Sequence, residues 1–269
     1  MRKITFEERL VGTRESRAVK VFSIEDIESH FNETLERIRI QLVVECDLSA
    51  GGKAEEGAEI LRSQVVFVES AYDYFLHELI RLGVLNIFAG EWPEDGSAYL
   101  ELQLSLGVLK KALSCSEVED WLTDWITDKY SHVTLMDYPS LKDICGLLGI
   151  SVKEVADLAF YRFGSDVDTE QMLENELHSL YQRRNQIAHQ SDRKMGTAER
   201  EEISCEYVEE KIHNVRKVVL ALCELARSKG QEKTRHLKIG SWMKSLRRDL
   251  LLLLEVRMCQ IAQLNVSPA

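Results

Sequence analysis

The sequence predicts an all-α fold, and two observations lead to that prediction. Turn-forming residues are scarce, with only 3 prolines and 14 glycines in 269 residues, whereas the helix-favouring leucine, glutamate and arginine are abundant. Apolar residues also recur at steps of three and four over long stretches, which is the period that places them on one face of a helix. This length suits one large domain, or one domain with extensions.

The first helix is expected to start after Ser23. Residues 1–22 alternate between apolar and polar side chains, which suggests a short hairpin. Ser23 followed by Glu25 and Asp26 is typical of an N-terminal cap with an acidic first turn. A helical stripe then runs through Ile24, Ile27, Phe31, Leu35 and Ile38. Residues 47–57 (DLSAGGKAEEG) are expected to form a loop.

The strongest helical pattern in the chain covers residues 54–88, and Gly90 and Pro93 are expected to end it. Its apolar stripe comprises Ile60, Leu61, Val65, Val68, Ala71, Tyr72, Phe75, Leu76, Leu79 and Ile80. On the same stretch Glu69 and Asp73 stand four residues apart, and we expect them to belong to a charged, solvated face. A helix of this length can cross a whole domain.

Shorter helices with recognisable starts are expected over residues 98–113, 116–132, 138–150 and 151–162. The second is expected to start at Ser116 and the third at the Pro139–Ser140 pair. Ser151 is expected to cap the fourth, with Glu154 completing a capping box.

A further helix, capped by Asp168 or Thr169, is expected to carry an unusual polar motif near its end. The segment 191–199 (SDRKMGTAE) then interrupts the helical pattern. A second long helix is expected over residues 199–230, closed by Gly230.

The composition limits where the protein acts. The longest apolar run, residues 250–256 (LLLLLEV), is far shorter than the roughly 20 residues of a membrane span, and we assign it to one of one or two helices in residues 235–269. The start of the chain has no apolar segment of the secretory type. The 6 cysteines are scattered without a CxxC pair, which is typical of reduced structural thiols. We therefore expect a cytoplasmic protein without a metal or cofactor and without a membrane partner.

The net charge of −11 gives the chain no overall attraction for nucleic acid, because phosphate binding depends on nearby lysine and arginine side chains. An RNA site would need a local basic cluster. Residues 183–194 offer one, with Arg162 upstream, and residues 235–248 offer another. Motifs for phosphate-binding loops, dinucleotides, zinc proteases and serine hydrolases are absent from the sequence.

The polar motif is RRNQIAHQSD, residues 183–192. On a helix, Tyr181, Asn185 and His189 share one face because they recur at steps of four. Leu177 and Tyr181 predict that this face is buried, and Arg184 flanks it. The polar side chains are therefore expected to continue the buried face. A solvated helix end, with histidine and arginine binding the last carbonyls, is the alternative.

Residues 184–189 (RNQIAH) resemble the R-N-x-x-x-H signature of the HEPN superfamily, helical domains that are largely RNA-cleaving or RNA-associated. The surroundings are similar too: residues 62–83 look like the first long helix of such domains, and residues 125–150 like their middle section. The resemblance covers residues 55–228. It is closest to the branch found in bacterial toxin–antitoxin and phage-defence loci.

The resemblance implies that Arg184 and His189 are catalytic and that Asn185 orients them. The implied reaction is metal-independent cleavage of RNA by the ribose 2′-hydroxyl. An imidazole can exchange protons with the 2′-hydroxyl or the 5′-oxygen leaving group. A guanidinium can hold the non-bridging phosphate oxygens as charge develops on them.

The resemblance also implies a homodimer that brings two motifs into one cleft. A twofold axis would gather Arg183, Arg184 and Arg193 of both copies into one basic groove, with Lys194 nearby. Tyr181 would pack at the dimer seam or stack on a base. The resemblance implies a HEPN-like up-and-down helical bundle in residues 55–230, with an N-terminal extension in 1–54 and a C-terminal helical extension in 231–269.

Three functions remain open at this point. The first is a toxin or phage-defence endoribonuclease whose partners are RNA, a second copy and an antitoxin or other protein. The second is a non-catalytic HEPN-like module that binds RNA or protein. The third is a plain helical protein in which residues 183–192 form a capped helix end.

Overall fold

The computed structural model describes residues 20–114, 118–163 and 166–231. Across these ranges every regular element is a helix, apart from an isolated antiparallel bridge between Arg193 and Arg200. The all-α prediction is thus confirmed. None of the described helices carries an apolar stretch long enough to cross a bilayer. The hairpin expected before Ser23 lies almost wholly outside the described residues, as do the helices expected after residue 234.

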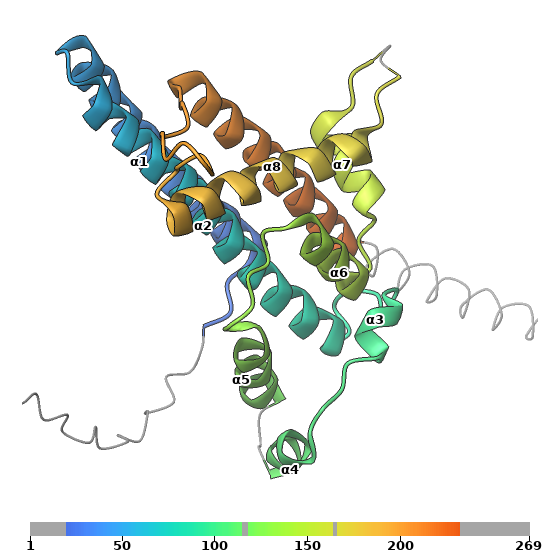
Figure 1. Cartoon of the computed structure of the whole chain (residues 1–269). Helices are drawn as coiled ribbons and strands as arrows, with labels where there is room; N and C mark the ends of the chain where they lie inside the picture. Colours follow the sequence, from blue (N-terminus) through green and yellow to red (C-terminus); the bar gives the residue numbers. More distant parts are fainter. Residues whose placement is uncertain (1–19, 115–117, 164–165, 232–269) are drawn as a thin grey trace, which may run out of the picture.

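Helices α1 (Ile24–Ala50) and α2 (Ala54–Phe88) run side by side as a long hairpin (Figure 1). The expected cap of α1 is confirmed: Ser23 Oγ accepts a hydrogen bond from the Asp26 amide at 3.1 Å, and the Asp26 carboxylate accepts one from the Ser23 amide. The boundary expected between the N-terminal extension and the helical domain, at residue 54, falls at the start of α2. Helix α1 shares its core with α2, and the ring of Phe31 meets that of Phe75 edge-on at 5.9 Å.

The loop expected over residues 47–57 is wrong in extent, because only residues 51–53 lie outside the two helices. Side-chain contacts keep both ends helical. Ser49 Oγ donates to Glu45 at 2.7 Å within α1, and Gly57 of α2 packs directly against this pair. Gly52, with φ of +77°, makes the reversal in a conformation that favours glycine.

Helix α2 is the central element of the bundle, since α1, α5, α6 and α8 all pack against it. Its predicted apolar stripe is buried from Leu61 to Ile80, and the expected helix end after residue 88 is confirmed. Burial extends to polar positions as well, including Arg62, Gln64 and Glu69. The polar side chains of α2 therefore need partners from the helices that surround it.

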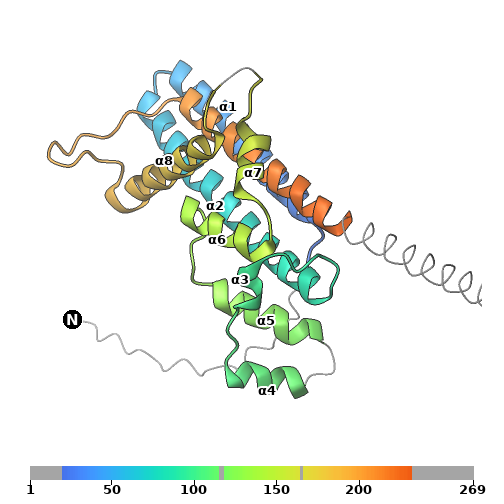
Figure 2. The ribbon, with the colours of Figure 1, turned by 90° about the vertical axis from the view of Figure 1, so that its right-hand side faces the viewer.

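The shorter helices are α3 (Ser97–Leu100), α4 (Leu106–Ser114), α5 (Val118–Tyr130), α6 (Tyr138–Leu148) and α7 (Val152–Phe160). The single helix expected over 98–113 is wrong, because residues 101–105 interrupt it. The two pieces have different partners: α3 packs on α6, whereas α4 packs on α5 at the far end of the molecule (Figure 2). One straight helix would not reach both.

The expected starts of α6 and α7 are correct in position, and the expected cap of α7 is confirmed. Asp137, rather than the Pro139–Ser140 pair, caps α6 by accepting from the Ser140 amide at 2.9 Å. Ser151 caps α7 by accepting from the Glu154 amide, which is only the first of the two bonds of a capping box. Ser116 lies outside the described residues.

Helix α8 (Thr169–Gln190) starts at the expected cap, where Asp168 accepts hydrogen bonds from the amides of Glu170 and Gln171. The last described helix covers residues 205–231, so it starts later than expected and Gly230 does not end it. Residues 199–204 are not helical, and the carbonyl groups of Glu201 and Glu202 accept hydrogen bonds from arginine side chains of α2 and α8.

Gly96→Ala is expected to destabilise the fold by about 1–3 kcal/mol, because overpacking at a buried site forces its neighbours to move. An added Cβ at Gly96 would meet the carbonyl oxygens of Gly146 and Leu147 at 2.6 and 2.7 Å. Gly146→Ala is the matched control, since it lies within α6 and its Cβ would meet nothing within 4 Å. Urea unfolding would compare them, and equal stability of the two variants would contradict this packing.

Candidate functional site

The buried stripe of α8 leads directly to the polar motif. It comprises Leu173, Leu177 and Leu180, and it continues through the half-buried Arg184 and Ile187. The face that was expected to be buried, through Tyr181, Asn185 and His189, becomes more exposed along its length, and His189 is exposed. The expectation that Tyr181 lies on the buried side of α8 is met in part, because Tyr181 is half-buried. Arg184 contacts α2, Asn185 is half-buried beside it, and His189 is exposed.

Arg184 is held against α2 by a buried carboxyl group. Its Nε lies 2.8 Å from Oε2 of Glu69, and its Nη1 donates to Oδ1 of Asn185 at 3.0 Å. The first contact is an ion-pair distance without hydrogen-bond geometry, since the Nε–H group does not point at the oxygen. The Glu69 side chain is only 1% exposed, whereas that of Arg184 is 27% exposed. The guanidinium thus has one side fixed and one side open.

Burial raises the pKa of Glu69 to about 8, against the opposing charge of Arg184 and with a smaller contribution from Asp73. Neither carboxyl oxygen of Glu69 receives a hydrogen bond from the described residues, so little compensates the loss of solvation. At neutral pH the carboxyl is then mostly protonated. It orients Arg184 without cancelling the positive charge of the guanidinium.

His189 does not cap the end of α8. The last turn is closed by backbone, with the Asp192 amide donating to the Gln186 carbonyl at 3.1 Å. Ser191 and Asp192 take up left-handed conformations, with φ of 54° and 58°. Within the described part of the chain, the His189 imidazole has no hydrogen bond or ion pair. The geometry therefore does not support the alternative in which this histidine binds the last carbonyls.

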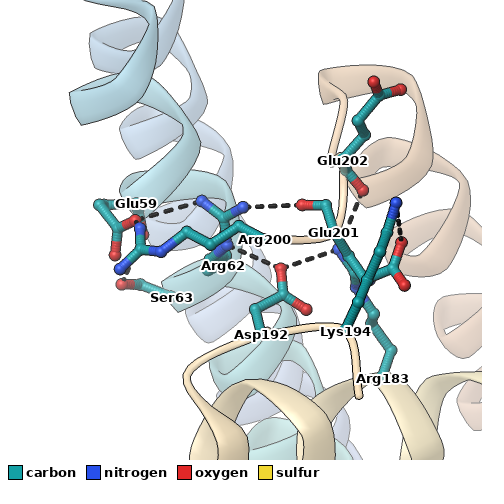
Figure 3. A network of polar contacts seen from close by, with 9 residues as sticks. All are labelled: Glu59, Arg62, Ser63, Arg183, Asp192, Lys194, Arg200, Glu201 and Glu202. Atoms are coloured by element: carbon teal, nitrogen blue, oxygen red, sulfur yellow. Dashed lines mark hydrogen bonds and ion pairs between the residues drawn. The ribbon is translucent and has the colours of Figure 1, made fainter. Parts of the chain in front are cut away.

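Asp192 is the centre of a polar network that joins α2 to the end of α8 (Figure 3). Its side chain is 0% exposed, and one oxygen, Oδ2, accepts from Arg62 Nε at 2.7 Å and from Arg183 Nη2 at 2.9 Å. The same two arginines donate to the carbonyls of Glu201 and Glu202, at 2.8 and 2.9 Å. The network fixes the chain both before and after the loop that follows α8.

The sequence predicts that Arg183 contacts phosphate or RNA. In the structure its guanidinium donates instead to Asp192 and to the backbone carbonyl of Glu202. Its side chain is mostly buried and its charge is balanced by a carboxylate. Arg183 therefore serves to hold the fold together at the end of α8.

The loop after α8 carries the exposed basic residues and projects from the bundle (Figure 2). Arg193 Nη1 donates to the Ala198 carbonyl at 2.6 Å, and Lys194 forms a long ion pair of 3.7 Å with Glu201. Both side chains are exposed. Tyr181 lies outside this loop and is half-buried on α8. The basic side chains that are open to solvent thus lie beside, rather than within, the motif helix.

The residues that position the site were not recognised from sequence. Glu69 was assigned to a solvated face, but it is buried, and Asp73 accepts from the Leu135 amide at 2.7 Å. Glu69 lies four residues after Val65 and three before Tyr72, and this spacing is the signal that it faces inward. Asp192 and Arg62 offered no such signal, because 130 positions separate them.

No group of three potential metal ligands includes a residue of this site, among the residues that the structure describes. Comparison with protein-family models, with curated proteins and with solved structures finds no match to this chain. The function is therefore argued from the site itself.

Asp192→Ala is expected to cost about 3–5 kcal/mol of stability, because it leaves Arg62 and Arg183 without their buried counter-charge. Lys194→Ala is the matched control from the same loop, and removing this exposed pair should change stability by less than about 1 kcal/mol. Chemical denaturation measures both values. A cost for Asp192→Ala as small as that of the control would show that the network does not hold the fold together.

Glu69→Gln is expected to flatten the pH dependence of stability. The folded carboxyl keeps its proton up to about pH 8, whereas the unfolded one releases it near 4.5. Between these values the folded protein binds more protons than the unfolded chain, so its stability falls as pH rises. Glutamine has no such proton, so the fall should be smaller. Parallel slopes for wild type and variant, in unfolding experiments across this range, would contradict a protonated Glu69.

Proposed function

We propose that this chain is a metal-independent endoribonuclease that cleaves RNA through the ribose 2′-hydroxyl, with Arg184 and His189 as catalytic residues. One observation carries the proposal. A guanidinium fixed from behind by a buried carboxyl group lies on the same helix as an exposed imidazole that has no partner among the described residues. Because the nucleophile belongs to the substrate, neither a protein nucleophile nor a metal is needed.

Arg184 is suited to bind the phosphate group at the bond that is cleaved. The neutral form of Glu69 leaves the guanidinium its charge, and the contact to Asn185 fixes the plane of the fork. A preorganised donor of this kind stabilises charge that develops on the phosphate oxygens, without having to reorient during the reaction. Asn185 thus serves Arg184 directly, as a positioning residue.

His189 suits proton transfer. Histidine is the side chain that most readily gains and loses a proton near neutral pH. Its exposed position in the last turn of α8 leaves both ring nitrogens accessible to a bound RNA. The imidazole would accept the 2′-hydroxyl proton or protonate the departing 5′-oxygen.

One chain supplies one pair of Arg184 and His189, and we propose that two chains form a homodimer. A groove between α2 and the end of α8 is lined by Phe67, Ile187 and Ser191, and Phe67 is 47% exposed. A second copy related by a twofold axis would cover these apolar side chains and bring the two motifs together. The exposed Arg193 and Lys194 of both copies would then contact the RNA backbone.

A non-catalytic module that binds RNA or protein is the second candidate, and a specific observation favours it. Arg183 and Arg184 both have carboxyl partners within the chain, as expected of arginines that hold helices together. In that case the exposed loop around Arg193 would bind the partner, and His189 would take no part. The role as a toxin or phage-defence effector rests on the HEPN resemblance and belongs to the first candidate.

Arg184→Ala and His189→Ala are each expected to lower the rate of RNA cleavage in EDTA by about a hundredfold or more, because each removes a group that acts in the transition state. Single-turnover cleavage of a labelled RNA measures the rate. Both variants should keep their helicity: a protonated Glu69 tolerates the loss of Arg184, and His189 has no described partner.

His178→Ala is the matched control, since it removes another exposed histidine of the same helix and should leave cleavage unchanged. Cleavage that survives both Arg184→Ala and His189→Ala would refute the proposed site. RNA that binds to the wild type and stays intact would favour the module instead.

A further inference from the structure

A second group of reactive side chains lies where the end of α1 meets the start of the helix at residues 205–231. Glu45 and Cys46 come from α1, and Cys205 is the first residue of that helix. Their carboxylate oxygen and two sulfur atoms all lie within 4.8 Å of one another. The remaining cysteines that the structure describes, Cys145 and Cys223, are buried in the core.

The spacing is close to that of a tetrahedral metal site. Zinc takes thiolate sulfur at about 2.3 Å and carboxylate oxygen at about 2.0–2.2 Å, so neighbouring donors in such a site stand roughly 3.5–3.8 Å apart. Donors that already lie within 4.8 Å of one another need to approach by only about 1 Å. Rotation of the two cysteine side chains provides a movement of this size.

Glu45 is buried, and a hydrogen bond from Ser49 holds its carboxylate. Its residue is 8% exposed, and among the described residues no cationic side chain pairs with it. Ser49 Oγ donates to its Oε1 at 2.7 Å, and Gly57 packs so closely that an added Cβ would meet Ser49 Oγ at 3.0 Å. Buried carboxylates are usually paired or bound to a metal, and a hydrogen bond from behind is how ligating carboxylates are oriented.

The cluster is accessible from solvent. Cys46 is exposed and Cys205 is half-buried, and both line a groove together with Arg39 and Glu209. Glu209 follows Cys205 by one helical turn, so the two share a face. A metal can therefore enter through the groove, and water or Glu209 can complete a fourth position.

We propose that Glu45, Cys46 and Cys205 form a binding site for a thiophilic divalent cation of the zinc type. Two sulfur donors and one oxygen donor select such a cation over magnesium or calcium, which prefer oxygen ligands alone. Binding releases the two thiol protons and ties α1 to the first turn of the helix at residues 205–231. The site is independent of the proposed RNA cleavage and lies on other residues.

Cadmium is the probe, because thiolate-to-cadmium charge transfer gives an ultraviolet absorption band that oxygen ligands do not give. Titration of the reduced full-length chain, under anaerobic conditions, should saturate this band at one cadmium ion per chain. Competition with a chromophoric chelator then gives the zinc affinity. Cys46→Ser and Cys205→Ser should each remove most of the band and weaken zinc binding by at least about tenfold.

Two further variants make the test specific. Ser49→Ala keeps all three donors and removes only the hydrogen bond behind Glu45, so it should weaken zinc binding by about tenfold while the band persists. Cys145→Ala with Cys223→Ala is the matched control, since it removes the two other described cysteines, which are buried in the core, and should leave binding unchanged. Absence of the band in the wild type, or an undiminished band in Cys46→Ser and Cys205→Ser, would overturn the proposal.

Discussion

The arrangement of the polar surface depends on the ion pairs that the buried Asp192 carboxylate forms with Arg62 and Arg183. Removing a carboxylate and two guanidinium groups from water costs several kcal/mol, and the cost is offset only where charges and hydrogen bonds are well matched. Here Arg62 and Arg183 converge on one oxygen and also donate to the carbonyls of Glu201 and Glu202 (Figure 3). The geometry after α8 follows from this match, including the left-handed Ser191 and Asp192, which are uncommon conformations for residues other than glycine.

The same arrangement explains why Arg183 and Arg184, although adjacent, differ in what they can do. Arg183 pairs with the buried Asp192, which it shares with Arg62, so its guanidinium is used within the fold. Arg184 meets Glu69, whose burial without hydrogen bonds favours the neutral acid. Of these two neighbouring arginines, Arg183 thus holds the helix end, whereas the charge of Arg184 is not cancelled by its neutral partner. Rigid helices on both sides of the contact give Arg184 the fixed position that a catalytic group needs.

Local patterns were enough to predict most of the fold. The caps at Ser23 and Asp168 and the extent of α2 depend on residues within a few positions of one another, which sequence displays directly. The prediction of a loop over 47–57 is wrong because glycine and charged residues do not end the helix here. Glu45 and Ser49, one helical turn apart, stabilise the end of α1 through a hydrogen bond. The helix expected over 98–113 failed for a tertiary reason, the two different partners of α3 and α4.

The candidate site was predicted only in part. The motif itself was visible, and so was the helix that carries Arg184 and His189. The groups that determine how these residues behave come from elsewhere in the chain: Glu69 from α2, and Arg62 at a separation of 130 positions from Asp192. Contacts of this kind leave no local pattern in one sequence. For the same reason the scattered cysteines suggested no metal site, since Cys46 and Cys205 meet only in the fold.

The central claim is that the ribose 2′-hydroxyl of the substrate is the nucleophile and that Arg184 and His189 assist it. Analysis of the ends of the cleaved RNA tests this claim most directly, because the attacking group determines where the phosphate remains. If the 2′-hydroxyl attacks, the fragments carry 2′,3′-cyclic phosphate or 3′-phosphate ends together with 5′-hydroxyl ends, and we expect this result. Fragments with 3′-hydroxyl and 5′-phosphate ends would show that water attacked instead, and would contradict it.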